Sequence, residues 1–590
     1  MRIVILGGYG VFGGRLVELL SDLAALDLLV CGRDLARAAA FCARHRGRAR
    51  VSPIRLDRAD IAGALAEHRP DLVVDASGPF QHYGADRYRV ISACIAAGTD
   101  YLDFADAADF VFGVAQFDAQ AREAGVFVLS GVSSFPVLTA AVLRAMAGTM
   151  SITAVAGGIA PSPYAGIGLN VMRAVVGYAG APVKLLRGGR QALGVGLGES
   201  MRYTIAAPGR LPLRNIRFSL VDVPDLQVIP PEHPGMTDIW MGAGPVPESL
   251  HLMLNLLAKA RATFRLPSLA PFSRLFYAVL NRLRFGDHRG GMFVRARGTA
   301  GGRAVERSWH LLAEGDDGPY IPSMAVEGIV RKLLAGERPA AGARSGVRAL
   351  ELADYDALFA GRRIYTGFRD DGADAPLYRQ VLGPAFAALP GQVRQLHDSG
   401  TARRWSGMAE VRRGRDVGAR LVATLIGFPK AAPHVPVSVE FTPQHGGERW
   451  VRTFGGASFS SLQSLGVGRN QNMLVERFGI ASFALALLVE GDRLVLLPRR
   501  WSLLGIPMPR FLLPSGLSFE TERDGQFASD VRIEAPLIGL IVAYRGTLTP
   551  DRANQGAAAV RPEQAWQARG VGRVRLAPPA GQADGMHTRP

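Results

Sequence analysis

The chain has 590 residues, of which 48% are hydrophobic and 20% charged, so it is long enough for several hydrophobic cores. Its formal charge is +17, but the basic residues are spread through every segment, which disfavours nucleic acid as a partner. The cysteines Cys31, Cys42 and Cys94 form no Cys-x-x-Cys pair, which disfavours both a disulfide framework and a structural zinc site. No run reaches about 18 uninterrupted apolar residues, and we expect a cytoplasmic protein.

Residues 1–130 alternate between strand-like and helix-like segments. Six apolar runs predict strands over 2–7, 26–32, 51–57, 72–77, 99–104 and 125–130. Near-continuous apolar strands separated by amphipathic helices are typical of a parallel sheet covered on both faces. The sequence therefore predicts the α/β class, with a doubly wound Rossmann domain over residues 1–130.

The pattern loosens over residues 131–360. Strand-like pieces such as "GMFVRARGTA" alternate with helical pieces such as "SMAVEGIVRKLLAG". This mixture predicts an α+β substrate domain on a mainly antiparallel sheet, and we expect its last helix, 322–335, to return to the first domain. The Gly, Asp and Pro content of residues 361–376 favours a linker.

Residues 377–550 begin helical and then become strongly strand-like, with turns such as "HGGE" and "RDGQ" between alternating strands. A sheet curled into a partial barrel is the simplest way to hide so many strand edges. His397, His434 and His445 lack the spacing of metal ligands, so no metal site is expected. Residues 551–590 are rich in Ala, Gly, Arg and Pro, which predicts a disordered tail.

The first predicted strand runs into "GGYGVFGG", where Gly8, Gly10 and Gly13 form a Gly-x-Gly-x-x-Gly motif before a helix. Such glycines allow a tight turn, a close approach of a pyrophosphate and close packing of helix on strand. The helix N-terminus then faces the phosphate charge. The motif and its context predict a dinucleotide site, and the alternative is a purely structural glycine turn.

The second predicted strand ends in "VCGRD". Arg33 at its tip is suited to a 2′-phosphate, which favours NADP, whereas the neighbouring Asp34 would serve a ribose hydroxyl and favour NAD. Asp57, after the third strand, is a candidate contact for the adenine end. The alternatives are a solvated Arg33 and helix-capping roles for Asp34 and Asp57.

The stretch "DASGPFQHYG" follows the fourth predicted strand. Ser77, Gly78, Pro79 and Phe80 fall at the carboxyl edge of the sheet, where open α/β sheets hold ligands. We expect them to line the nicotinamide side. With "GGYGVFG", "GRD" and "ACIAAGTDYLDF", this stretch resembles the saccharopine dehydrogenase-like NAD(P)-binding family, including its trans-acting enoyl reductase branch. The similarity covers roughly residues 1–360.

The resemblance implies a nicotinamide cofactor and assigns positions to it. The pyrophosphate would lie around Gly8, Gly10, Val11, Phe12 and Gly13, the 2′-phosphate near Arg33, and the rest of the cofactor beside Gly78, Pro79 and Phe80.

The catalytic end is less well defined. In "YLDFADAADF" the chain departs from the family's commoner pattern, in which Tyr-x-Asp is followed by Gly-Glu. Tyr101 and Asp103 share one face of the fifth predicted strand, so a tyrosine proton donor oriented by a carboxylate is one interpretation. A partly buried tyrosine bonded to the aspartate is the other. His82 and Tyr83, on the preceding loop, are comparable candidates.

Residues 377–550 resemble a domain of unknown function that is often fused behind such domains, through "LGPAFAALPGQVRQLHDSG" and "GERWVRTFGGASFSS". Between Glu248 and Asp287 there is no acidic residue, and "FSRLFYAVLNRLRF" is amphipathic. This pattern predicts that residues 269–285 contact an anionic membrane or cover a lipid pocket, and the alternative is an ordinary core helix.

Taken together, these features predict an NAD(P)-dependent oxidoreductase, with NADP favoured, that acts on a C=O, C=N or activated C=C bond. The hydrophobic middle segment favours a small or lipid-like substrate. The alternative function is a non-catalytic nucleotide-binding sensor or scaffold whose C-terminal domain binds a lipid or a partner. The oligomeric state is left open.

Overall fold

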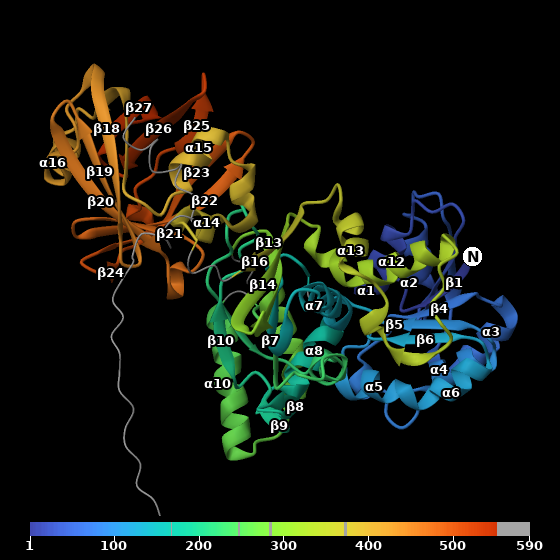
Figure 1. The fold of residues 1–590 in the computed structure, drawn as a ribbon. Coiled ribbons are helices and arrows are strands. Elements are labelled where there is room, and N and C mark those ends of the chain that lie inside the picture. The colour runs from blue at the N-terminus through green and yellow to red at the C-terminus, as the bar shows by residue number, and fades with distance from the viewer. Residues whose placement is uncertain (167, 246–247, 283–285, 371–374, 552–590) are drawn as a thin grey trace, which may run out of the picture.

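The computed structural model describes residues 1–166, 168–245, 248–282, 286–370 and 375–551 and arranges them around three large sheets (Figure 1). The tail predicted over 551–590 lies, apart from its first residue, outside the described residues. Among the described residues, no helix combines the length and the hydropathy that crossing a bilayer requires.

The first sheet is parallel throughout and confirms the predicted Rossmann architecture. In spatial order its strands are β15 (Gly342–Ser345), β6 (Phe127–Ser130), β5 (Asp100–Asp103), β4 (Leu72–Asp75), β1 (Arg2–Leu6), β2 (Asp27–Gly32) and β3 (Arg50–Arg55). The strand order reverses between β1 and β4, which is the point where doubly wound sheets bind ligands. The sequence analysis did not predict β15, because its Gly-Ala-Arg-Ser sequence contains no apolar run.

Helices cover this sheet and connect its strands (Figure 1). They are α1 (Val11–Leu19), α2 (Leu35–Cys42), α3 (Ile61–His68), α4 (Arg89–Ala96), α5 (Ala108–Gly113), α6 (Asp118–Glu123), α7 (Thr139–Ala147), α12 (Ile321–Leu334) and α13 (Leu352–Phe359). The helix α1 buries Leu16, Val17 and Leu19 and leaves Glu18 exposed, as expected for an amphipathic helix on a sheet.

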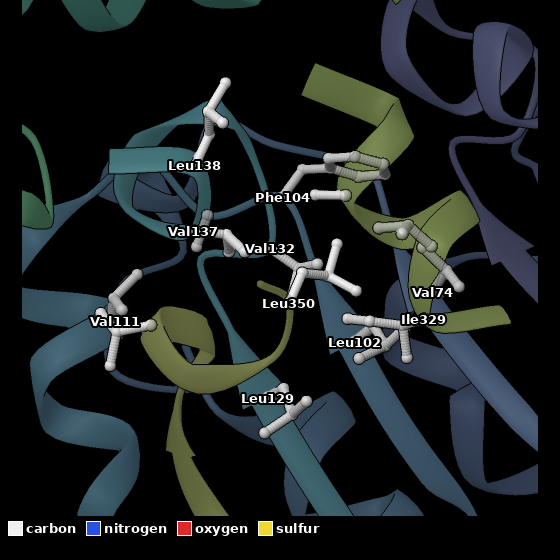
Figure 2. Packing of buried hydrophobic residues seen from close by; sticks show 14 of the residues in the cluster. Val74, Leu102, Phe104, Val111, Leu129, Val132, Val137, Leu138, Ile329 and Leu350 are labelled. Atoms are coloured by element: carbon white, nitrogen blue, oxygen red, sulfur yellow. The ribbon is translucent and has the colours of Figure 1, made fainter. Parts of the chain in front are cut away.

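Helix α12 returns to the first domain, as predicted. Figure 2 shows Ile329 of α12 and Leu350 among buried side chains of the first domain, including Val74 and Leu102. Burying each such side chain contributes about 1.5–3 kcal/mol. The Ser323 hydroxyl also donates to the Phe12 carbonyl at 3.1 Å, so α12 is held against the first turn of α1.

The second sheet is mixed. In spatial order it contains β10 (Ser200–Tyr203), β11 (Ile216–Leu220), β12 (Asp238–Ala243), β7 (Ser151–Ala160), β13 (Arg289–Ala300), β14 (Arg303–Glu314) and β16 (Ile364–Asp370). Only β12 and β7 pair in parallel among these described strands. Its accessory elements are the hairpin of β8 (Pro182–Arg187) and β9 (Arg190–Val195) and the helices α8 (Leu169–Tyr178), α9 (Asp225–Val228), α10 (Glu248–Phe264) and α11 (Ser273–Arg282).

The linker predicted over 361–376 is wrong for its first half. Residues Ile364–Asp370 form β16, which pairs antiparallel with β14 and completes the second sheet. Glycine and charged residues interrupt the apolar pattern of this strand, so its apolar residues Ile364, Tyr365 and Phe368 did not form a recognisable run. In the structure these three residues supply its apolar contacts. Residues 371–374 lie outside the described part of the chain.

The third domain is a closed antiparallel barrel of ten strands, whereas the sequence predicted a partial barrel. The barrel strands are β17 (Arg403–Arg413), β18 (Ala432–Gln444), β19 (Gly447–Phe454), β20 (Ala457–Leu465), β21 (Leu474–Phe478), β22 (Ala481–Glu490), β23 (Arg493–Leu503), β25 (Ser518–Arg523), β26 (Gln526–Ala535) and β27 (Gly539–Pro550), and the short β24 (Ile506–Pro507) extends β23. Pairing of β22 with β23 closes the ring and removes the exposed edges.

Three helices accompany the barrel: α14 (Leu377–Leu382), α15 (Gly391–His397) and α16 (Val417–Ile426). The barrel contacts the second domain through backbone and side-chain hydrogen bonds. The Val489 amide donates to the Gly209 carbonyl at 3.0 Å, and the Asn472 side chain donates to the Thr204 carbonyl at 3.4 Å.

Candidate functional site

A glycine turn joins β1 to α1 and forms the centre of the candidate site. Gly7 adopts a left-handed conformation with φ of 71°, and a Cβ there would stand 2.8 Å from the Ala76 carbonyl oxygen. A Cβ on Gly13 would collide with the Gly7 carbonyl, so only glycine lets α1 approach β1 this closely. Gly7, which the motif analysis omitted, is therefore as necessary to the turn as Gly13.

The first turn of α1 presents its amides outward. The Gly10 amide donates a hydrogen bond to the Gly7 carbonyl at 2.8 Å, and the Gly8 amide donates one to the Cys31 carbonyl at 3.1 Å. The amides of Val11, Phe12 and Gly13 come from the first helical turn, where no intrahelical acceptor exists. Because Gly10 is exposed and without a side chain, this positive helix end is open to an anion.

The two residues predicted at the end of β2, Arg33 and Asp34, have different surroundings. The Asp34 carboxylate accepts from the Arg37 amide at 3.0 Å and caps α2, while the exposed Arg33 makes no ion pair with any described residue. The Tyr9 ring lies over Gly32, its hydroxyl accepts from the Asp34 amide at 3.2 Å, and the Arg37 guanidinium lies 5.4 Å from its centre. Sequence reasoning missed Tyr9, which packs against the residue before Arg33, and Arg37, which lies over the Tyr9 ring.

Asp57 lies at the end of β3, where its side chain accepts from the Ala59 amide at 3.0 Å. This bond caps the short helical turn Arg58–Asp60. Asp57 thus has a structural role as a cap. Its side chain is exposed, and its contact with a cofactor stays a prediction.

A hydrogen-bonded chain orders the loop after β4. The Ser77 hydroxyl donates to the buried Asp75 carboxylate at 2.5 Å and lies 2.7 Å from the Tyr83 hydroxyl. The Arg58 guanidinium lies 3.7 Å from the centre of the Tyr83 ring, with its Nε 3.9 Å from Asp75. Burial raises the pKa of Asp75, and the bonds from Ser77 and the charge of Arg58 oppose that rise.

The remaining loop residues lie at different depths. Phe80 is buried against Tyr83 and Phe110, with ring centres 5.0 and 5.1 Å apart. Gly78 and Pro79 are half-buried, and the Gly78 carbonyl accepts from the Asn170 side chain of α8 at 2.9 Å. This bond ties the predicted nicotinamide loop to the second domain.

The three catalytic candidates from the sequence lie at different depths, although Asp103 is near enough to Tyr101 to add to the rise that burial causes in the pKa of Tyr101. His82 is exposed on the loop, whereas Tyr101 is 1% exposed inside the core. Asp103 is fully buried, and its Oδ1 accepts from the Gly131 amide at 2.7 Å, the Ala105 amide at 2.9 Å and the Ser130 hydroxyl at 3.0 Å. Asp103 therefore joins the ends of β5 and β6.

A cavity of about 370 Å³ begins at the first turn of α1 and extends along the second sheet. Its walls are mostly apolar and include Val11, Phe12, Ile159, Val171, Met172, Val175, Leu197, Val221, Ala243, Leu254, Met292 and Leu311. The Arg15 guanidinium donates to the Ala165 carbonyl at 2.7 Å, so this arginine joins α1 to the segment before α8. Sequence reasoning did not find this cavity, because its walls come from many separate segments of the chain without a shared motif.

Two acidic groups and a tyrosine, Asp106, Asp222 and Tyr178, are among the polar side chains that line the cavity. Burial, together with Asp109 and Asp106, raises the pKa of Asp222 to about 6. Burial also raises the pKa of Asp106, although the Gln81 side chain donates to it at 3.1 Å. The pKa of Tyr178 is raised by burial and then by Asp106 and Asp222. Tyr178 therefore keeps its proton at neutral pH, and Asp222 takes up a proton at about pH 6.

His251 of α10 is the second polar feature of the cavity wall. Its side chain is 3% exposed, and neither ring nitrogen has a hydrogen-bond partner among the described residues. Burial lowers its pKa to about 4, so the imidazole is neutral and offers one donor and one acceptor. Its signal in the sequence was its spacing, because His251, Leu254 and Ala258 share one helical face.

Comparison with known proteins identifies two parts of the chain. Residues 3–129 match the saccharopine dehydrogenase NADP binding domain, and residues 389–548 match a domain of unknown function, DUF4166. Neither match includes residues 130–388, which hold most of the cavity. No curated protein sequence matches the chain.

Several solved structures match part of the chain at low sequence identity. Saccharopine dehydrogenase (L-Glu forming) from Saccharomyces cerevisiae is 14% identical, with a TM-score of 0.44 over 62% of this chain and 99% of that one. Amine dehydrogenase from Mycobacterium smegmatis is 11% identical, with a TM-score of 0.30 over 58% and 94%. The WlbA dehydrogenase from Thermus thermophilus, solved with NAD and alpha-ketoglutarate, is 12% identical, with a TM-score of 0.27 over 58% and 90%.

The pH dependence of stability tests the role of Asp103. Burial raises its folded-state pKa to about 7 from an ordinary 3.8, so the folded protein keeps this proton after the unfolded chain has lost it. The free energy of unfolding should therefore fall as pH rises from about 4 to about 7. Asp103→Asn keeps an oxygen acceptor but carries no charge. In this variant the decrease in the free energy of unfolding between about pH 5 and pH 8, measured by urea unfolding, should be smaller than in the wild type by about 2–3 kcal/mol.

Asp60→Asn, which changes an exposed carboxylate in the same domain, is the control and should retain the wild-type pH profile. An Asp103→Asn profile parallel to wild type would show that Asp103 does not hold the proton.

These matches place residues 3–129 with the saccharopine dehydrogenase NADP binding domain and residues 389–548 with a domain of unknown function, as the two resemblances in the sequence predicted.

Proposed function

We propose that this chain is an NAD(P)-dependent oxidoreductase that moves hydride between the nicotinamide and a C=O, C=N or activated C=C bond of an apolar substrate. The observation that carries the proposal is the apolar cavity whose wall begins at Val11 and Phe12, in the first turn of the NADP binding domain's first helix. A substrate there would lie beside the cofactor and away from water. The bound nicotinamide supplies or accepts the hydride.

NADP is the favoured cofactor. Arg33 is free of acidic partners among the described residues, and Arg37 lies over the ring of Tyr9, which packs against the neighbouring Gly32. The carboxylate of Asp34, which would serve a ribose hydroxyl, is already used as the cap of α2. Two guanidinium groups near one phosphate form the stronger, charge-assisted hydrogen bonds.

The cavity residues supply the proton that accompanies the hydride. When hydride adds to one atom of the double bond, the other atom takes a proton, and oxidation reverses both transfers. The Asp222 carboxyl, with a pKa raised to about 6, and the Tyr178 hydroxyl stand on the cavity wall. We assign proton transfer to these two groups and hydrogen bonding of the substrate's polar group to His251.

Cofactor titration tests the proposal directly. A Cβ at Gly10 would meet only the Gly7 carbonyl, at 3.0 Å, and would project toward the expected diphosphate position. Gly10→Ala should therefore weaken NADPH and NADH binding alike, by about tenfold or more, as measured by fluorescence titration. Gly63→Ala is the matched control, because that exposed glycine of α3 has no neighbour within 4 Å and should bind both cofactors normally.

In the same titration, Arg33→Ser should weaken NADPH by about tenfold and leave NADH unchanged, because only NADPH carries the 2′-phosphate. Arg303→Ser, at an exposed turn of the second sheet, is the control. Equal losses for both nucleotides would contradict the NADP assignment. Binding of NADPH without turnover of any carbonyl, imine or enoyl substrate would favour the sensor or scaffold function.

Turnover as a function of pH tests Asp222. The wild-type rate in the reductive direction should decline as pH rises past about 6, because the carboxyl group loses the proton that it donates. Asp222→Asn should lower the rate by about tenfold or more and remove this inflection. An unchanged inflection in the variant would assign the proton donor to another group.

Binding of a ketone tests His251. We expect His251→Leu to weaken binding of 2-decanone about tenfold, because the variant loses one hydrogen bond to the carbonyl. The free energy of unfolding of the same variant should be about 1 kcal/mol higher than that of the wild type, because the variant removes a buried unsatisfied polar group. Displacement of an apolar fluorescent probe gives the affinity, and unchanged displacement would show that His251 does not contact the ligand.

A further inference from the structure

Helix α10 has two faces with different surroundings. Its inner face carries His251 and Leu254, which line the cavity. Its outer face exposes Leu252, Met253, Leu256, Leu257 and Phe264, and the last three are 67%, 37% and 72% exposed. In Figure 1 the helix lies at the end of the second domain that points away from the first and third domains. One helix therefore separates the cavity from an apolar outer surface.

The exposed apolar surface continues beyond the helix. Leu266, Phe272 and Leu275 are 50%, 55% and 60% exposed, whereas Phe276 packs against the cluster that contains Leu254. We call these three and the five exposed residues of α10 the α10 surface. The sequence analysis placed membrane contact over 269–285, but the structure exposes the larger apolar area on α10. The side chain of Leu280 and residues 283–285 lie outside the described part of the chain.

The chain segment that carries the α10 surface has charges of one sign only. Residues 249–286 contain no Asp or Glu but six cations, Lys259, Arg261, Arg265, Arg274, Arg282 and Arg284. Arg261 is engaged with the Gly177 carbonyl at 3.1 Å. Lys259, Arg265 and Arg274 are exposed and form no ion pair with any described residue. Exposed apolar side chains among unpaired cations complement an anionic lipid surface.

We propose that the α10 surface docks on an anionic lipid bilayer and that apolar substrates pass from the bilayer along α10 into the cavity. The docking stands on the surface alone, whereas the passage of substrate rests on the proposed function. A second copy of the chain is the poorer occupant, because a symmetric contact would bring two sets of unpaired cations together. The apolar side chains would lie in the headgroup boundary, with the cations against the lipid phosphates.

A second exposed apolar face provides a matched control. Helix α16 of the barrel exposes Val417, Leu421 and Leu425 by 70–81%, so these side chains are at least as accessible as those of α10. Helix α16 belongs to the barrel, and none of its residues lines the cavity of the second domain. If exposed leucines alone caused docking, α16 would serve as well as α10.

Co-sedimentation with vesicles tests the docking. The full chain should pellet with phosphatidylcholine vesicles that contain phosphatidylglycerol, and high salt or pure phosphatidylcholine should reduce this. The double variant L256D/F264D should bind at least tenfold more weakly. Reversing Lys259 and Arg265 to Glu should also weaken binding at least tenfold, because each lost cation costs roughly fivefold. The control L421D/L425D should bind as wild type does.

Absence of wild-type binding at low salt would overturn the docking, and so would an equal loss in the α16 control. Because these positions are exposed, all variants should retain the wild-type thermal midpoint and NADPH affinity. Those two readouts separate a failure of docking from a failure of the proposed function.

Transfer of an apolar fluorescent probe from the vesicles tests the passage of substrate. The wild type should take up the probe at least tenfold faster than L256D/F264D, and the two should have equal affinity for the probe without vesicles. Equal transfer rates would overturn the passage of substrate along α10. They would not bear on the docking, which the co-sedimentation experiment tests separately.

Discussion

The close approach of α1 to β1 is the constraint on which the rest of the structure depends. It requires that no side chain stand at Gly7 or Gly13, because each Cβ would meet a backbone carbonyl oxygen. This approach sets the positive end of α1 at the carboxyl edge of the parallel sheet. It also fixes Val11 and Phe12 as the first wall of the cavity. One turn thus places the cofactor and substrate regions side by side.

Two other segments hold the second domain against that turn. Ser323 of α12 bonds to the Phe12 carbonyl, and Arg15 bonds to the Ala165 carbonyl. From the other side, Asn170 bonds to Gly78 in the loop after β4. These contacts join the glycine turn, the α8 segment and the predicted nicotinamide loop. The cavity is therefore a product of domain packing, and neither domain alone forms it.

This origin explains what the sequence could and could not predict. The parallel strands and the glycine turn have local signals, namely apolar runs and fixed glycine spacing, so their positions were predicted to within a few residues. Tyr101 and Asp103 were correctly placed on one strand, but the two-residue period could not show that both side chains are buried. The strand β15 and the strand β16 inside the predicted linker have weak local signals and form through pairing with β6 and β14.

The polar cavity residues had only a weak local signal, which was the spacing of His251 with Leu254 and Ala258 on one face of α10. Tyr178, Asp222 and His251 lie on three separate elements, and their proximity arises from the packing of the second sheet. Their chemistry also depends on burial, which raises the pKa of Asp222 and lowers that of His251. A carboxylate or an imidazole in a sequence carries no mark of its future desolvation.

Helix α10 departs from the usual pattern of a surface helix on both of its faces. An ordinary surface helix buries apolar side chains and exposes polar ones, whereas α10 buries an imidazole without partners and exposes Leu256 and Phe264. Each departure costs stability or solubility, and packing does not require either of them, because Leu254 and Ala258 already supply the core contacts of this helix. Departures from local rules gather where function requires them. The inner imidazole suits a polar group on a bound molecule, and the outer leucines suit an apolar surface, so one helix relates both features to a single apolar ligand.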